Sequence, residues 1–266
     1  MKNIIYLSIF KFCQICIPQS LQSYLLNILL KLRGYNNYKN FNESGEKYFL
    51  NKVLAKHEPK ICIDVGSNIG NYAKEILTTT NSKVISFEPL KEPFKKLEEL
   101  KVIWGDRLIL VNKGLGARES RKKIYFNKES LSHASFVKEI SNLSYISNHR
   151  EEEVLVTTLD NFIEQNSINS PIDYIKIDTE GFEYDVLLGC KNIIKFNRPK
   201  FIHIEFNWHQ LIKSQTLYSF SLLLSEYDIF QMLPNGLVKR DPIDPISNIY
   251  SYSNFAFVRK DLSIEE

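Results

Sequence analysis

The sequence predicts an α/β protein with an open, mostly parallel sheet. Short continuous apolar runs recur along the chain and alternate with stretches of helical periodicity, as expected for strands that are buried on both faces of a parallel sheet. The last run, Asn254 to Arg259, alternates between two sets of residues with period two. This pattern predicts that the final strand is antiparallel to the others.

Each element of the sheet is recognisable in chain order. The predicted strands are Ile61 to Val65, Val84 to Phe87, Leu108 to Val111, Tyr174 to Ile177, Phe201 to Glu205, Asp228 to Leu233 and Asn254 to Arg259. A helix is predicted before the first strand, from Glu46 to His57. The predicted helices between the strands are Asn71 to Leu77, Lys91 to Leu100, Phe182 to Leu188 and Thr216 to Ser225. This order is typical of right-handed βαβ units.

The length and composition favour one domain with an N-terminal extension. The chain has 266 residues, of which 44% are hydrophobic and 24% charged, as in ordinary globular proteins. We expect residues 1–45 to form a helical extension and linker, and residues 46–266 to form the α/β domain. The 34 basic and 31 acidic residues give a net charge of +3, which is too balanced to predict a nucleic-acid partner.

Two apolar segments precede the domain. Ile4 to Ile17 is interrupted by Lys11 and ended by Pro18, so it is too short to cross a bilayer and does not resemble a cleaved signal peptide. Leu21 to Leu32 has apolar residues at helical spacing. We favour the interpretation that both helices pack on the domain; the alternative is that residues 1–33 contact a membrane surface. The expected location is the cytoplasm, or the inner face of the membrane if that contact forms.

The most informative turn follows the first predicted strand. Asp64, Gly66 and Gly70 form a D-x-G-x-x-x-G turn, and Glu88 follows the next strand. Such a turn lets the backbone approach a ligand, and a carboxylate at the second strand end can accept hydrogen bonds from a ribose diol. Asn68 occupies the position at which a dinucleotide-binding G-x-G-x-x-G motif has its second glycine. We therefore expect no pyrophosphate-binding site at this turn.

A second set of motifs lies further along the chain. Thr158 to Phe162 reads T-L-D-N-F, Lys176 to Gly181 reads K-I-D-T-E-G, and a helix carrying Glu183 and Gly189 follows. Over about residues 61–206 the chain resembles the FkbM family of methyltransferases, from which it departs conservatively at Thr179. The resemblance implies a class I methyltransferase (Rossmann-like) fold, a seven-stranded mixed sheet with an antiparallel last strand, and S-adenosylmethionine as cofactor. The implied cofactor-binding residues are Asp64, Gly66, Asn68, Gly70, Asn71, Glu88 and Asn112.

The candidate catalytic residues stand at strand ends or close to them. They are Asp178, Glu180, Glu205 and His203, because ligands bind outside the carboxyl ends of parallel strands and a hydroxyl acceptor must lose a proton. Asp178 could instead cap a helix, and His203 could be a hydrogen-bonded core residue. His209 and Trp208 could line the acceptor site. The acids also suit magnesium, but their spacing alone does not establish a site, so we expect no metal.

The segment between Ile124 and Val156 interrupts the α/β pattern and is predicted to be an insert. Within it, Ser130 to Val137 is expected to border the acceptor pocket. The predicted acceptor is a small molecule or a glycan, methylated on a hydroxyl oxygen, with N-methylation left open. Two other functions remain as alternatives: an oxidoreductase that binds a dinucleotide or nucleotide sugar, and a noncatalytic cofactor-binding protein.

Overall fold

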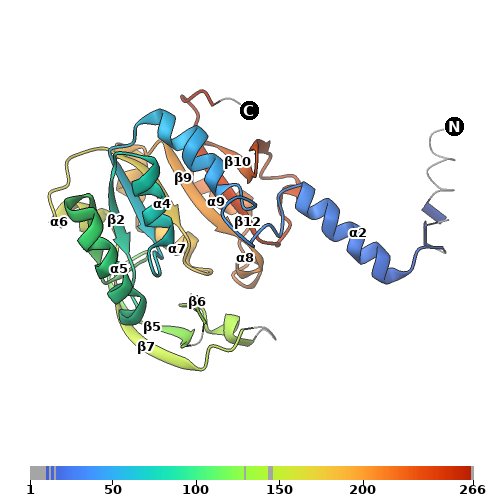
Figure 1. Cartoon of the computed structure of the whole chain (residues 1–266), viewed down its shortest axis with the longest axis horizontal. Coiled ribbons are helices and arrows are strands. Elements are labelled where there is room, and N and C mark those ends of the chain that lie inside the picture. The colour runs from blue at the N-terminus through green and yellow to red at the C-terminus, as the bar shows by residue number, and fades with distance from the viewer. Residues whose placement is uncertain (1–9, 12, 15, 129, 143–145, 265–266) are drawn as a thin grey trace.

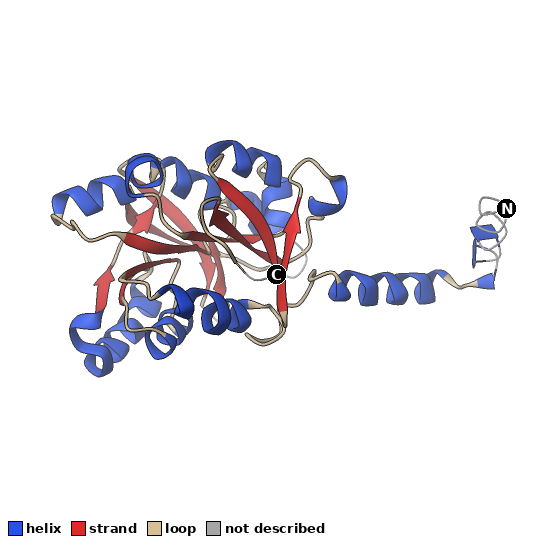
Figure 2. Cartoon of the chain, turned by 90° about the horizontal axis from the view of Figure 1, so that it is seen from above, coloured by secondary structure: helices blue, strands red, loops and turns tan. Residues whose placement is uncertain are grey.

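The computed structural model describes residues 10–11, 13–14, 16–128, 130–142 and 146–264. Most of the first apolar segment therefore lies outside the described residues. The body of the molecule is a central sheet with helices on both faces, and helix α2, Gln19–Leu32, extends away from it on the N-terminal side (Figures 1 and 2).

The central sheet has eight strands in the order β11-β10-β12-β9-β8-β1-β2-β3. Their bounds are β1 Ile61–Val65, β2 Lys83–Phe87, β3 Leu108–Val111, β8 Ile172–Ile177, β9 Phe201–Phe206, β10 Tyr227–Leu233, β11 Gly236–Arg240 and β12 Ser253–Arg259. Strand β12 is antiparallel to both of its neighbours, β9 and β10, while β1 pairs in parallel with β2 and β8. The predicted fold class and antiparallel final strand are thus confirmed.

The number of strands differs from the prediction. Strand β11 forms an antiparallel hairpin with β10 and makes the sheet eight-stranded instead of seven-stranded. Its sequence, Gly236 to Arg240, is short and ends in two basic residues, so it lacks the continuous apolar run that marks the buried strands. The hairpin turn at Pro234 to Gly236 instead brings β11 alongside β10, where the two strands pair.

Helices cover both faces of this sheet (Figure 2). They are α3 Glu46–Tyr48, α4 Asn71–Thr79, α5 Lys91–Trp104, α6 Leu159–Gln165, α7 Glu183–Leu188, α8 Trp208–Ile212 and α9 Leu217–Leu223, with π-helices at Phe49–Leu54 and Ile193–Asn197. One apolar core joins the sheet to the first π-helix and α4, and the other joins the opposite face to α7 and α9. The predicted helix from Glu46 to His57 forms as α3, the first π-helix and a closing 3-10 turn.

Residues 114–157 build a second, smaller sheet of order β4-β7-β5-β6, which begins before the predicted insert from Ile124 to Val156. Its strands are β4 Gly114–Leu115, β5 Ser120–Asn127, β6 Ser130–Ser135 and β7 Arg150–Thr157, with a 3-10 turn at Lys138–Asn142. Leu90, which precedes α5, packs with apolar residues of β5 and β7. The small sheet therefore lies beside the carboxyl end of β2.

The expectation that the second N-terminal helix packs on the domain is wrong. Helix α2, Gln19–Leu32, has no buried residue, and both views show it projecting from the body (Figures 1 and 2). A helix that packs on the domain and a helix that exposes its apolar face have the same spacing of apolar residues. The sequence therefore could not distinguish these two arrangements for α2. Within the described part of the chain, no helix has both the length and the hydropathy needed to cross a membrane.

Candidate functional site

The turns after β1 and β8 are in direct contact. Gly66 has φ +81°, and a Cβ atom added there would lie 1.8 Å from the carbonyl oxygen of Asp178. Only glycine combines this left-handed conformation with such a close backbone approach. The contact brings the first glycine turn and the K-I-D-T-E-G loop to one edge of the sheet.

Glu88 organises the glycine turn from the end of β2. Its Oε2 accepts a hydrogen bond from the backbone N–H of Asn68 at 2.8 Å, and its Oε1 accepts one from Leu90 at 2.8 Å. Asn112 donates to the carbonyl oxygen of Glu88 at 2.9 Å and holds the same strand end from the other side. Burial raises the pKa of Glu88 to about 7. Each carboxylate oxygen keeps a second lone pair that can accept a ligand hydroxyl.

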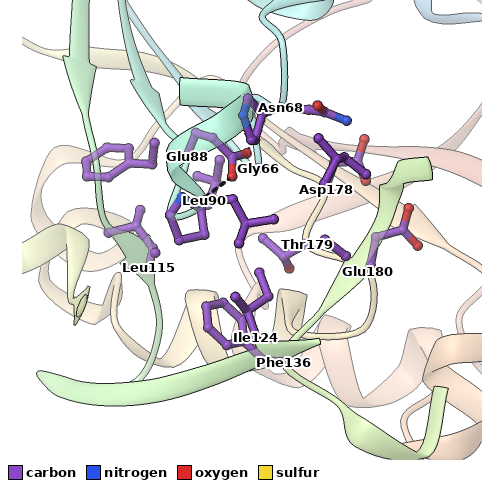
Figure 3. Close-up of a pocket in the computed structure, with 17 residues that line it drawn as sticks. Gly66, Asn68, Glu88, Leu90, Leu115, Ile124, Phe136, Asp178, Thr179 and Glu180 are labelled. Carbon is purple, nitrogen blue, oxygen red and sulfur yellow. Dashed lines mark hydrogen bonds between the residues drawn. The ribbon is translucent and has the colours of Figure 1, made fainter. Parts of the chain in front are cut away.

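A cavity of about 230 Å³ opens beside these groups (Figure 3). Its polar lining includes Asn68, Glu88, Asp178, Thr179 and Glu180. Its apolar wall comes from β1, β2, the segment after β2, and the small sheet with the residue that follows β6: Val65, Phe87, Leu90, Leu115, Ile124, Leu131, Ala134 and Phe136. Part of the predicted segment 130–137 therefore closes this first cavity.

The loop after β8 is held by Glu183. Its Oε1 accepts hydrogen bonds from the backbone N–H groups of Thr179 (3.0 Å) and Gly181 (3.1 Å), and its Oε2 accepts one from Gln210 at 2.7 Å. Glu180 adopts φ +53°, which is uncommon for a residue with a side chain. Strained positions of this kind cluster at functional sites, and Glu183 is the group that maintains this one.

A second cavity, of about 630 Å³, lies on the other side of this loop. It is lined by Asn36, Tyr38, His133, Glu180, Glu205, Asn207, Trp208, His209, Tyr250, Ser251 and Tyr252. Among these described lining residues, Glu180 is the one that the first cavity shares. Glu180 therefore borders both cavities.

The acids between the cavities are crowded. Burial raises the pKa of Glu180 well above its usual range, and the negative charges of Glu205 and Asp178 add to the effect. Burial and the charge of Asp178 raise the pKa of Glu205 in the same way. Burial lowers the pKa of His209 to about 3, so its ring is neutral at pH 7. Nδ1 of His209 lies 3.2 Å from Oε2 of Glu180.

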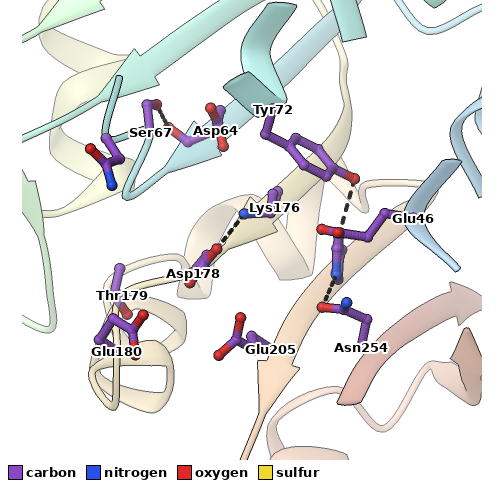
Figure 4. Close-up of polar contacts among 12 residues, drawn as sticks. Glu46, Asp64, Ser67, Tyr72, Lys176, Asp178, Thr179, Glu180, Glu205 and Asn254 are labelled. Carbon is purple, nitrogen blue, oxygen red and sulfur yellow. Dashed lines mark hydrogen bonds and ion pairs between the residues drawn. The ribbon is translucent and has the colours of Figure 1, made fainter. Parts of the chain in front are cut away.

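Lys176 is the buried cation beneath the site (Figure 4). Its Nζ lies 2.7 Å from Oδ2 of Asp178 and 4.5 Å from the centre of the Tyr72 ring. Burial acts to lower the pKa of this amine, but the negative charges of Asp178, Asp64 and Glu46 outweigh it and raise the pKa. Asp64 is fully buried below the cavity and does not line it.

His203 lies apart from both cavities. Its Nε2 contacts Oδ1 of Asn254 at 2.8 Å, and its Nδ1 contacts the hydroxyl of Tyr174 at 2.9 Å. Burial lowers its pKa to about 3. The ring is therefore neutral and fully hydrogen-bonded, with one nitrogen as donor and the other as acceptor. Asn254 in turn donates to the hydroxyl of Tyr252, which borders the second cavity.

The structure brings most of the sequence-predicted residues to one region. Gly66, Asn68, Glu88, Asp178 and Glu180 line the first cavity and Glu205 lines the second, whereas Asp64, Gly70, Asn71, Asn112 and His203 lie outside both linings. Gly70, at φ +85°, precedes α4, which Asn71 begins. Nothing tests the individual roles, so they stay predictions.

Sequence reasoning missed part of the second cavity. Asn36 and Tyr38 come from the stretch taken as a linker, and Tyr250, Ser251 and Tyr252 precede the last strand. For Asn36 and Tyr38, the visible signal was the Asn- and Tyr-rich composition of residues 35–40. The role of Glu183 in holding the loop was also missed, although the motif that contains it was recognised.

Comparison with known proteins supports one family. The model of the methyltransferase FkbM domain matches residues 64–228. The hexuronic acid methyltransferase AglP of Haloferax volcanii is 27% identical over 154 residues, which are 57% of this chain and 59% of AglP. The match thus spans about three fifths of that relative's length.

Two solved structures were also found. An O-methyltransferase from Bacillus cereus in complex with SAH gives a TM-score of 0.46 at 11% identity and covers 94% of this chain and 96% of that one. A putative rRNA methylase from Clostridium thermocellum gives a TM-score of 0.47 at 10% identity, with 85% and 98% covered.

Replacing Lys176 with methionine should destabilise the protein by about 3–5 kcal/mol, because buried carboxylates would lose their cation. Equilibrium urea unfolding measures the change. The control is Lys91→Met, which removes an ion pair with Glu152 from a lysine side chain that is 76% exposed and should cost about 1 kcal/mol or less. Equal effects of the two substitutions would contradict the central role of Lys176.

Proposed function

We propose that this chain, which belongs to the FkbM methyltransferase family, transfers a methyl group from S-adenosylmethionine to a hydroxyl oxygen of a sugar or glycan. The family match over residues 64–228 supports methyl transfer. The observation that carries the two-substrate assignment is the pair of cavities that meet at Glu180.

The first cavity is assigned to the cofactor. Glu88 would accept hydrogen bonds from the ribose hydroxyls, while the apolar wall formed by Phe87, Leu90 and Leu115 suits an adenine ring. Gly66 and Asn68 would place the turn against the methionine part. Asp64, Gly70, Asn71 and Asn112 would act indirectly, because they support the turn and the strand end without lining the cavity.

The transfer itself needs alignment in a pocket that excludes water, and no covalent intermediate on the protein. The acceptor oxygen attacks the methyl carbon, the carbon–sulfur bond breaks, and S-adenosylhomocysteine and a methyl ether form. Glu180 would receive the hydroxyl proton, since it borders both cavities. Asp178 would orient the loop through its ion pair with Lys176, and Glu205 would face the acceptor. His203 would position Tyr252 through Asn254.

The second cavity is assigned to the acceptor. Tyr38, Trp208, Tyr250 and Tyr252 offer aromatic faces of the kind that suit sugar rings. No lysine or arginine occurs among the described residues that line it, which disfavours a phosphate backbone and hence a nucleic acid. AglP acts on a hexuronic acid, which supports a sugar acceptor here.

Calorimetric titration with S-adenosylhomocysteine tests the cofactor assignment. We expect binding of this ligand and not of NADH or NADPH, which represent the oxidoreductase alternative. Glu88→Gln should weaken binding about tenfold or more, because the charged acceptor of the ribose diol is lost. Binding of a nicotinamide cofactor alone would contradict the proposal.

The same titration should depend on pH. The pKa of Glu88 is raised to about 7, so the group is largely protonated at about pH 6 and ionised at about pH 8. The ionised form accepts ribose hydrogen bonds better, so affinity should rise with pH over this range by up to about tenfold. Glu88→Gln has no such titration and should show little pH dependence. A wild-type affinity that falls between these pH values would contradict the role of Glu88.

Glu180→Gln should lower turnover by about a hundredfold while S-adenosylhomocysteine binding stays within about twofold, because the substitution removes the proton acceptor and keeps the shape. The assay follows methyl transfer from labelled S-adenosylmethionine to neutral oligosaccharides and to ones that contain hexuronic acid. Glu226→Gln, whose side chain is 70% exposed, is the matched control and should keep full activity. If no sugar is methylated although the cofactor binds, the acceptor assignment is wrong.

The domain division is also a proposal. Residues 46–266 would form the catalytic domain, and residues 1–33 would contact a membrane surface. Helix α2 exposes Leu21, Tyr24, Leu25, Leu26, Ile28, Leu29 and Leu32. It contains no acidic residue, and Lys31 lies in its last turn. An apolar, weakly basic helix of 14 residues suits the interface of an anionic bilayer and is too short to span it.

A variant that lacks residues 1–33 tests this division. It should lose co-sedimentation with vesicles that contain phosphatidylglycerol and keep S-adenosylhomocysteine binding, because α2 has no buried residue. The full chain with Leu25→Glu and Leu29→Glu should lose vesicle binding in the same way. Vesicle binding that persists in both variants would contradict the membrane role of α2.

A further inference from the structure

We infer that Glu180, Glu205 and His209 form a binding site for a divalent cation at the floor of the second cavity, one that accepts both carboxylate and imidazole ligands, such as Mn²⁺. Each of the three side chains offers one ligand atom, and these atoms lie within 4.8 Å of one another. The ligands of an ion with bonds of about 2.1 Å lie roughly 3–4 Å apart, so small side-chain rotations would complete the arrangement.

The state of His209 is the independent observation. Its side chain is 2% exposed, and neither ring nitrogen makes a hydrogen bond to any described residue. Nδ1 lies 3.2 Å from Oε2 of Glu180, yet the geometry is not that of a hydrogen bond. A buried imidazole without partners is costly, and it lines the cavity at the point where the two carboxylates converge. A bound cation would supply its missing partner.

The neighbouring groups support the same site. Asn207 donates from Nδ2 to Oε1 of Glu205 at 2.6 Å, and its Oδ1 accepts the backbone N–H of His209 at 2.7 Å. One residue thus orients two of the three ligands, as outer hydrogen bonds commonly do at metal sites. Glu183 holds the third ligand by fixing the loop that carries Glu180.

The charge balance also favours a cation. Glu180 and Glu205 each direct a carboxylate oxygen to the same point as His209, while Lys176 already pairs with Asp178. His133 and His209 are the basic groups among the described residues of the cavity lining. A divalent ion would compensate the negative charge of two carboxylates.

The role of the ion rests on the proposed function. An acceptor hydroxyl bound to the ion would lose its proton more readily, because the ion stabilises the alkoxide. The proton would pass to Oε1 of Glu180, which lies 3.9 Å from Nδ1 of the part-exposed His133, while Oε2 faces His209. A carboxylate on an acidic sugar could also bind the ion, which would permit a hexuronic acid in a cavity otherwise lined by acids.

Calorimetric titration of the chelator-treated full chain with MnCl₂ tests the site, with electron paramagnetic resonance as a second readout of bound Mn²⁺. The wild type should bind one ion per chain in the micromolar range. Glu205→Gln and His209→Gln should each weaken binding at least about tenfold. The matched controls are Glu226→Gln and His149→Gln, which change an exposed acid and an exposed histidine and should leave affinity unchanged.

Titration of each variant with S-adenosylhomocysteine shows whether it is folded and separates the two proposals. Failure of the wild type to bind Mn²⁺ at up to millimolar concentration, or wild-type affinity in both ligand variants, would overturn the cation site. Mn²⁺ binding without S-adenosylhomocysteine binding would leave the cation site standing and refute the proposed function.

Discussion

The site depends on one buried ammonium group. Lys176 lies on β8 in the middle of the sheet, and its charge acts on carboxylates from three parts of the chain: Glu46 before the first π-helix, Asp64 in β1 and Asp178 after β8. Burial raises the pKa of Glu46 and of Asp64, and the lysine opposes that shift in both. This arrangement ties the segment before the sheet to the strands that carry the site. It also explains why polar side chains can occupy the centre of an α/β core.

Two backbone constraints then set the positions of the functional groups. The contact between Gly66 and the carbonyl of Asp178 fixes the spacing of the β1 and β8 turns, and it leaves no room for a side chain. Glu183 accepts hydrogen bonds from the N–H groups of Thr179 and Gly181 and so holds the loop in which Glu180 has a positive φ. The first constraint shapes the first cavity, and the second positions Glu180, which borders both cavities. Both lie within motifs that the sequence displays, which is why a short stretch of sequence identifies the family.

The sequence predicted the parts of the structure whose determinants are local. Continuous apolar runs, and period-two alternation for the last strand, predicted seven strands. Of the strand-end residues predicted from them, Glu88, Asp178 and Glu180 line the first cavity and Glu205 lines the second, whereas Asp64 and Asn112 lie outside both linings. Strand β11 was missed because its pairing comes from a hairpin turn rather than an apolar run. The exposure of α2 was missed because apolar spacing does not say what covers a helix. Tyr38 lies far in the chain from Tyr250 and Tyr252, although all three line the second cavity. No single sequence motif could therefore predict that they come together.

The crowding of acids around Glu180 has a consequence for the proposed methyl transfer. S-adenosylmethionine carries a positive sulfonium that disappears as the methyl group leaves. Uncompensated negative charge beside it would stabilise the reactants more than the transition state, and would therefore raise the barrier. The same charge would oppose ionisation of the acceptor hydroxyl. Protons on Glu180 and Glu205 would remove the first penalty but also remove the base. A cation held by Glu180, Glu205 and His209 would compensate the negative charge, and so would remove both the raised barrier and the opposition to ionisation of the acceptor hydroxyl. It would also leave an oxygen of Glu180 to accept the proton.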